Sequence, residues 1–150
     1  MSVCIAEQVA VFLLAALQEV VDEGNANSVA RPKAYMLAKS PADKDLLLFQ
    51  GDPEKTDEGP VGFVEWNAPF MVSCFVRPSE ASASPVDTTI NEIRAQVEKK
   101  LRADPNCGGL TVDLRILSPE GFNLGEGTEG VTVNFQVVYR HREDDPYTQS

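Results

Sequence analysis

The residue types that most often build active sites are scarce in this chain. It has one histidine, His141, and three cysteines (Cys4, Cys74 and Cys107) with no C-x-x-C spacing. These residues do not make a zinc-ligand set, and buried, reduced cysteines are expected instead. No G-x-S-x-G motif marks a nucleophile, and no cysteine has the basic neighbours of a reactive thiolate. The sequence therefore predicts no catalytic, metal-binding or cofactor-binding residue, and a protein that is not an enzyme.

Positive charge is scarce as well. Lys and Arg number 13 against 23 Asp and Glu, which gives a net charge of −10 and a sequence pI of about 4.5. A nucleic-acid-binding protein needs a basic patch that replaces the counterions of the phosphates. The basic residues here are scattered, apart from Lys99–Lys100–Arg102 and Arg140 with Arg142. No sequence-specific DNA or RNA partner is expected, whereas an acidic surface would let nucleic acid pass without binding.

Membrane-spanning runs are missing too. The apolar run VAVFLLAAL at residues 9–17 is too short to cross a bilayer. The first residues also lack the basic region of a signal peptide. We expect no membrane partner, and a soluble protein made in the cytoplasm.

What is present is an ordinary globular composition. The chain has 150 residues, of which 43% are hydrophobic and 24% charged. This length suits one domain with its own core, and these fractions argue against wholesale disorder. A single domain is predicted over residues 1–150, with an acidic loop at 52–60 and a charged C-terminal tail at 142–150.

The first predicted helix covers residues 3–23 and ends at Gly24. Its apolar residues form one broad face. Val11 lies on the polar side of this helix, and Leu14 lies at the border of that side. Each is either an ordinary exposed apolar residue or part of a second packed face that meets a partner.

The second helix is predicted over residues 87–103 and is stopped by residues 104–109. Asp87 or Thr89 is expected to begin it, and Thr89 with Glu92 is expected to form a capping box. Its narrow apolar stripe consists of Ile90, Ile93, Val97 and Leu101.

Strands are expected at 33–39, 45–50, 62–67, 70–76, 110–117 and 131–142. In the last two, alternating apolar and polar residues carry the prediction. Ala68–Pro69 interrupts the middle pair, so one long bulged strand and two shorter strands both fit. Residues 77–85 are predicted to be a flexible connector. Strand 110–117 is expected to point four side chains inward: Leu110, Val112, Leu114 and Ile116. The element order predicts an α+β fold, in which a mostly antiparallel, mixed sheet is covered by two helices on one face.

The stretch GEGTEG at residues 125–130 matches the G-x-G-x-x-G pattern of dinucleotide-binding proteins. That pattern binds phosphate only where it leaves a strand and opens a helix. Here it follows SPEGFNL, which is predicted to be a loop, and precedes the alternating strand 131–142. Glu126 and Glu129 would also repel phosphates. GEGTEG is therefore predicted to be a hairpin turn.

The last residues combine charge with an aromatic side chain. Arg140 and Arg142 are followed by acidic residues and then by Asp145–Pro146–Tyr147. The proline predicts a fixed turn, and an exposed tyrosine beside it is a good anchor for a neighbouring chain. The alternative is that these charged residues only make the chain soluble.

Two segments carry a resemblance to a known family. One is the helix pattern I-x-x-I-x-x-x-V-x-x-x-L from Ile90, followed by D-P-x-x-G-G-L into a strand. The other is the ending V-N-F-Q-V-V-Y-R-H-R-E-D-D-P-Y. With the first helix and strand region before them, this layout resembles the tail terminator (tail completion, minor tail protein U-like) proteins of long-tailed bacteriophages. The resemblance covers nearly the whole chain, except residues 40–62.

The resemblance implies a structural virion protein that forms a homohexameric ring on the tail tube. The ring would end tube polymerisation and provide the surface for head–tail joining. Its partners would be further copies of itself, the tail tube protein and a head–tail connector or neck protein, and DNA would pass through its lumen. It would be assembled in the host cytoplasm and reside in the tail–neck region of the virion. The residues expected at a subunit or tube interface are Val11, Leu14, Arg140, Arg142, Asp145 and Tyr147.

Two other functions stay open at this point. The first is a head-side neck connector or minor capsid protein of similar size. The second, from another class, is a cellular small-ligand-binding or enzyme domain. The assembly state distinguishes them, because a ring supports a terminator and a strict monomer with a deep polar pocket supports a cellular domain.

Overall fold

The computed structural model describes residues 4–31, 43–77, 85–125 and 128–149. Within these ranges there are two α-helices, α1 (Ile5–Asp22) and α2 (Val86–Ala103), and one short 3-10 helix, η1 (Cys107–Gly109). The strands are β1 (Ser28–Ala30), β2 (Asp45–Gln50), β3 (Glu54–Thr56), β4 (Phe63–Val76), β5 (Asp113–Ile116), β6 (Glu120–Gly125), β7 (Thr128–Arg142) and β8 (Asp145–Gln149). None of the described helices is long and apolar enough to span a membrane.

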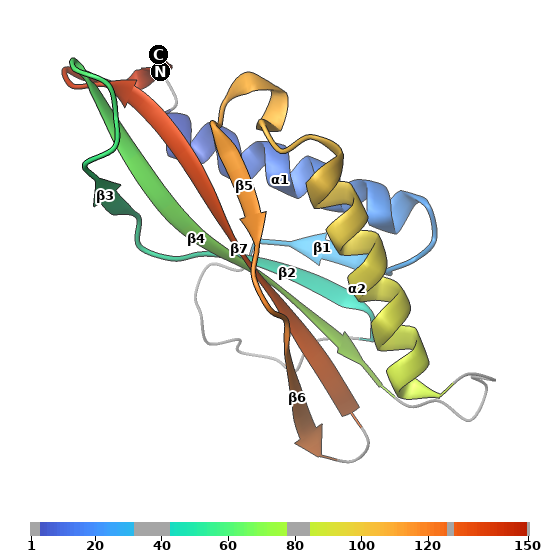
Figure 1. Ribbon diagram of the computed structural model, residues 1–150. Coiled ribbons are helices and arrows are strands. Elements are labelled where there is room, and N and C mark those ends of the chain that lie inside the picture. The colour runs from blue at the N-terminus through green and yellow to red at the C-terminus, as the bar shows by residue number, and fades with distance from the viewer. Residues whose placement is uncertain (1–3, 32–42, 78–84, 126–127, 150) are drawn as a thin grey trace.

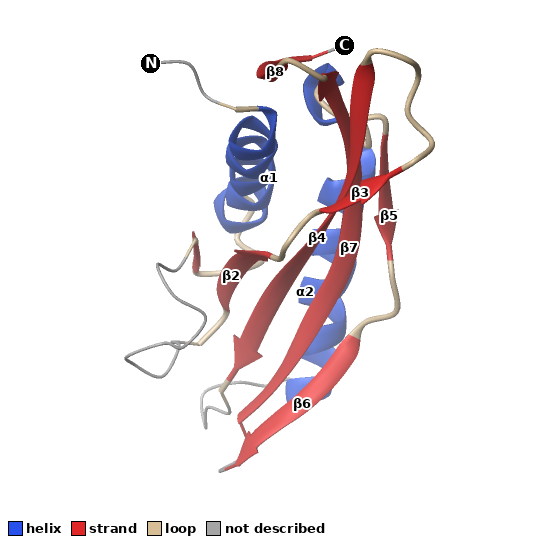
Figure 2. Cartoon of the chain, turned by 90° about the vertical axis from the view of Figure 1, so that its left-hand side faces the viewer, coloured by secondary structure: helices blue, strands red, loops and turns tan. Residues whose placement is uncertain are grey.

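The described strands form one mixed sheet that is mostly antiparallel (Figure 1). Its order is β1-β2-β4-β7-β5, with β3 paired to β4, and with β6 and β8 paired to β7. β4 and β7 are the long central pair and run side by side through the molecule (Figure 2). Both helices pack on one face of this sheet, which confirms the predicted α+β fold. α1 also contacts β8, so the first helix and the last strand lie at the same end of the molecule (Figure 1).

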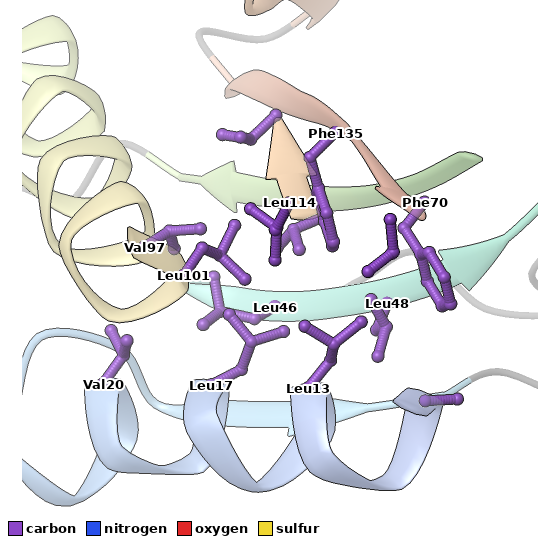
Figure 3. Close-up of a cluster of buried hydrophobic side chains, with 14 of the residues drawn as sticks. Leu13, Leu17, Val20, Leu46, Leu48, Phe70, Val97, Leu101, Leu114 and Phe135 are labelled. Carbon is purple, nitrogen blue, oxygen red and sulfur yellow. The ribbon is translucent and has the colours of Figure 1, made fainter. Parts of the chain in front are cut away.

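Alternation along the central strands decides which side chains meet the helices. On β7, Phe135 and Val137 are buried, whereas Gln136 and Val138 lie on the opposite side. Phe70 of β4 lies across from Phe135, and their rings stack with centroids 5.6 Å apart. Side chains of α1, α2, β2 and β5 complete this core in Figure 3: Leu13, Leu17, Val20, Leu46, Leu48, Val97, Leu101 and Leu114. We call the helix-covered side of the sheet the inner face and the other side the outer face.

β4 runs unbroken through Pro69, so of the two alternatives one long strand is correct. The carbonyl of Pro69 accepts a hydrogen bond from the Gly51 N–H at 2.8 Å. The N–H and C=O of a residue point to the same side of a strand, so the N–H that proline lacks would face β2 and not β7. β2 ends at Gln50, one residue before the Gly51 that faces Pro69. The β4–β7 ladder therefore continues past Pro69 in a single register without a bulge.

α1 confirms the first predicted helix, but the predicted capping box of α2 is wrong. α2 begins at Val86, and no side chain caps its first N–H groups. Pro85 occupies the N-cap position, because a proline next to a helix start loses no intrahelical hydrogen bond. Thr89 consequently lies inside the first turn, where its hydroxyl donates to the Pro85 carbonyl at 3.5 Å. Asp87 also lies inside α2 and accepts only from the neighbouring Thr88 N–H.

Three segments predicted to be loop or tail contain short strands. They are SPEGFNL, which includes the first residues of β6, the acidic loop 52–60, which includes β3, and the tail 142–150, which includes β8. Each pairs with β4 or β7, so a long neighbouring strand supplies order that the local sequence does not signal. β6 and β7 form a hairpin within GEGTEG, as predicted, with Gly125 at the end of β6 opposite Thr128. β7 already begins at Thr128, and residues 126–127 lie outside the described residues.

The strand predicted at 110–117 is shorter than expected. β5 begins only at Asp113, and Val112, which was expected to point inward, is 46% exposed. Leu114 is buried as predicted, and Ile116 packs against the core. The strand predicted at 33–39 and most of the connector 77–85 lie outside the described residues.

Candidate interaction surfaces

The first candidate surface is the exposed side of α1. Val11 is 55% exposed, whereas Val9, two residues earlier, is completely buried. Ala15, one turn after Val11, is also exposed. The preceding turn carries an ion pair between Glu7 and Arg31, with nitrogen and oxygen 2.6 Å apart. Val11 and Ala15 therefore form a small apolar strip beside charged groups, which we call the α1 strip.

The second candidate surface is on the outer face, where Arg140 binds a buried carboxylate. Arg140 Nε donates to Glu65 Oε1 at 2.9 Å, and Thr56 Oγ1 donates to Glu65 Oε2 at 2.6 Å. The Glu65 side chain is only 5% exposed. The hydrogen bond from Thr56 lowers the pKa of Glu65 against the effect of burial, and Arg140 lowers it further. Glu65 is thus a fixed, charged group whose two oxygens both have partners.

An open hollow of about 720 Å³ lies over this network, between β3 and β5. Asp57 and Glu58, which follow β3, stand on one wall and are exposed. Asp113 and Arg115 of β5 stand on the other and form an ion pair at 2.8 Å. Four carboxylates and two guanidinium groups line this hollow, so it is negatively charged. We call it the acidic hollow.

The third candidate surface is the end of the sheet where β7 turns into β8. Tyr147 is 48% exposed, and its backbone N–H donates to the Asp145 carboxylate at 2.9 Å. The Arg142 side chain is 61% exposed and lies 3.9 Å from Asp144. The predicted turn with an exposed aromatic is present, but it belongs to a paired strand and not to a free tail.

A second turn stands beside this one. The Glu143 N–H donates to the Gly62 carbonyl at 3.1 Å, which joins the β7–β8 turn to the turn that precedes β4. Val61 in that turn is fully exposed. The sequence reasoning missed Val61, although an apolar residue between Pro60 and Gly62 was a usable signal. We call Val61, Arg142 and Tyr147 the sheet tip.

The six residues predicted for an interface therefore do not form one surface. Val11 lies in the α1 strip and Arg140 in the acidic hollow. Arg142 and Tyr147 lie at the sheet tip with Asp145 beside them. The sixth residue, Leu14, is half-buried and packs against the core of its own chain.

The single histidine is held on the inner face. Trp66 Nε1–H donates to His141 Nε2 at 2.8 Å, and His141 Nδ1 lies 2.6 Å from the Arg142 carbonyl oxygen. An indole N–H can only donate and a carbonyl can only accept, so the ring is neutral with its proton on Nδ1. Both ring nitrogens are engaged, which makes His141 a structural residue in this chain.

The buried thiols have the environment of core residues. Burial raises the pKa of Cys74 to about 12 and that of Cys107 to about 11. Both stay protonated near neutral pH and are poor nucleophiles. The prediction of buried, unpaired cysteines is confirmed for these two, whereas Cys4 is half-buried. No group of His, Cys, Asp or Glu in the described ranges is arranged to hold a metal ion.

Among known proteins, the chain has distant neighbours in structure. No protein-family model and no curated protein matches the sequence. Among solved structures, the chain is similar to a chain in the virion of a native gene transfer agent (GTA) particle, with 12% identity and a TM-score of 0.45, over 92% of each chain.

Proposed function

We propose that this chain is a structural virion subunit of the tail-terminator type. Copies of it close into a ring on the last ring of a tail tube, end the polymerisation of the tube and present the surface that meets the neck or connector protein. The sequence resemblance in the second helix and in the C-terminal strand supports this function. The proposal includes no catalytic step, no cofactor and no metal.

One observation carries the proposal: exposed apolar side chains lie on different elements of the monomer. Val11 belongs to the helix layer, whereas Val61 and Tyr147 lie at the sheet tip. A ring repeats one heterologous contact, so each subunit must present two different complementary patches. In the proposed ring, these side chains would be the apolar parts of the two patches.

The charge of the chain fits the same function. The net charge of −10 disfavours DNA binding, and an acidic lumen would let DNA slide through the ring. His141, with a hydrogen bond at each ring nitrogen, and the protonated thiols of Cys74 and Cys107 are consistent with a structural role.

The proposal is tested by polymerising the tail tube protein encoded with this chain, with and without the purified chain. Electron microscopy measures tube lengths, and native mass spectrometry measures the assembly state. We expect shorter tubes that carry a ring of this chain at one end. Unchanged tube lengths with a strictly monomeric chain would refute a terminator. Binding to isolated head connectors in place of tubes would support the neck-connector alternative.

A further inference from the structure

The acidic hollow on the outer face has properties that the monomer does not use. Its floor is formed by β4 and β7, and the described helices pack on the inner face, so no described helix covers it. Asn67 Nδ2 on this floor donates to Gln136 Oε1 at 3.3 Å, but the buried Asn67 Oδ1 atom has no hydrogen-bond partner among the described residues. A buried acceptor without a donor costs about 1–3 kcal/mol. This one acceptor below the hollow is therefore unsatisfied in the monomer.

The wall after β3 carries two exposed carboxylates. Asp57 and Glu58 form no close ion pair within the described part of the chain, although the charge of Glu58 contributes to the raised pKa of Arg115 across the hollow. Val112 on the opposite wall adds a 46% exposed apolar side chain to the same hollow. The surface thus combines negative charge, an unsatisfied acceptor and a small apolar group. Its complement is a segment with two cationic donors.

The last turn of α2 has this complementary chemistry. Lys100 there is bound by Glu23 at 2.6 Å and by Glu19 at 3.2 Å, so it belongs to the contact between the two helices of its own chain. Lys99 and Arg102 are exposed and form no ion pair among the described residues. They lie in the helix layer, on the side of the sheet opposite the acidic hollow.

We infer that the acidic hollow of one copy receives the last turn of α2 of a second copy of this chain, with Lys99 and Arg102 facing Asp57 and Glu58. The inference rests on the proposed ring and names its subunit contact. Because hollow and helix are on opposite faces of one monomer, the contact is head to tail and can repeat around a ring.

The experiment exchanges the charges on the two surfaces. The hollow variant carries Asp57→Lys and Glu58→Lys, and the helix variant carries Lys99→Glu and Arg102→Glu. We expect each variant alone to need at least about tenfold more protein for assembly than the unchanged chain, which corresponds to about 1.4 kcal/mol. An equimolar mixture should assemble again, because every hollow then finds a helix of opposite charge. A chain with all four substitutions should also assemble.

A matched control separates the local contact from the long-range charge. Asp52→Lys with Glu92→Lys changes the net charge as much as the hollow variant, at exposed positions that do not line the hollow. This control should assemble like the unchanged chain, and circular dichroism should show all variants folded.

Two results would overturn the inferred contact. One is a control that loses assembly as much as the hollow variant does, and the other is a mixture of the hollow and helix variants that does not assemble. If the unchanged chain stays monomeric with and without tubes, the proposed function fails and the contact with it. If its ring forms and the swaps have no effect, only the contact fails.

A cross-linking variant tests the same contact without reversing charge. Glu58→Cys with Arg102→Cys should give disulfide-linked oligomers under mild oxidation, whereas either single substitution should not give chains longer than a dimer. Cys74 and Cys107 contribute little background, because burial raises the pKa of both thiols to about 12 and about 11. The unchanged chain measures the background from Cys4. Monomers alone in the double variant, under conditions where the unchanged chain forms rings, would overturn the contact.

Discussion

Replacing Val11 with aspartate should damage assembly far more than folding. Val11 is 55% exposed, so the new carboxylate remains hydrated in the monomer. Valine and aspartate have similar helix propensities. Repulsion from Glu7, one turn earlier, adds a few tenths of a kcal/mol, although Arg31 already binds Glu7. The total is about 1 kcal/mol at most, which lowers the melting temperature of a chain of this length by about 2–4 °C.

The same charge has a very different cost wherever Val11 is covered by a neighbouring subunit. A buried, unpaired carboxylate costs several kcal/mol at each contact, and this cost repeats at every interface of a ring. Val9→Asp is the matched control, because Val9 is completely buried in the monomer and lies only two residues away. That variant should lose its cooperative unfolding transition, since a penalty of several kcal/mol is comparable with the whole stability of a domain.

Thermal unfolding followed by circular dichroism measures the first effect, and sedimentation velocity measures the second. Val11→Thr keeps the shape of valine without a charge and should assemble nearly as well as the unchanged chain. The reasoning is refuted in either of two ways. A Val11→Asp chain as unstable as Val9→Asp places Val11 in the core, and normal assembly of Val11→Asp shows that Val11 stays exposed in the ring.

Three further predictions follow from the described surfaces. Tyr147→Ala should weaken ring or tube binding while the melting temperature stays within about 4 °C, because the side chain is 48% exposed; normal tube capping by this variant would remove the sheet tip from the contact. Glu65→Gln should destabilise the chain by about 2 kcal/mol at pH 7, the size of a charged hydrogen bond. Urea unfolding measures this loss of unfolding free energy as a function of pH. Because the folded-state pKa of Glu65 is lowered from its ordinary value of 4.5, the loss should be full above pH 4.5 and vanish as the pH falls below the folded-state pKa. A loss that does not depend on pH would contradict a charged Glu65. The chain should not retard double-stranded DNA at micromolar concentration in roughly 0.15 M salt, and a clear mobility shift would refute a repulsive surface of net charge −10.

Periodicity was enough to predict the elements that bury their own apolar faces. Both helices and β7 have strong patterns of period 3.6 or 2, because each packs one face directly on the core. β2 is instead a short apolar run in which Leu46, Leu47 and Leu48 are all buried. β3, β6 and β8 have weak local patterns, and they are strands only because β4 or β7 offers them a ladder. Short edge strands of this kind depend on tertiary pairing more than on propensity.

The candidate surfaces were predictable only in part, for a related reason. The exposure of Val11 follows from its position on the helical wheel, and that of Tyr147 from the turn after β7. The acidic hollow depends on register instead: Glu65 lies opposite Arg140 and Thr56 lies opposite Glu65. Nothing in the local sequence fixes which residues of two distant strands face each other, so this network could not be foreseen.

The contact between α1 and β8 has a practical consequence for the covalent design of assemblies. Since the first helix and the last strand are neighbours at one end of the monomer, the end of one copy and the start of the next would emerge on the same rim of a ring. A flexible linker that spans one subunit repeat would then join two copies. Such a tandem fusion raises the effective concentration of the second copy to about the millimolar range. It would turn a weak contact between subunits into an intramolecular equilibrium that can be measured on a single chain.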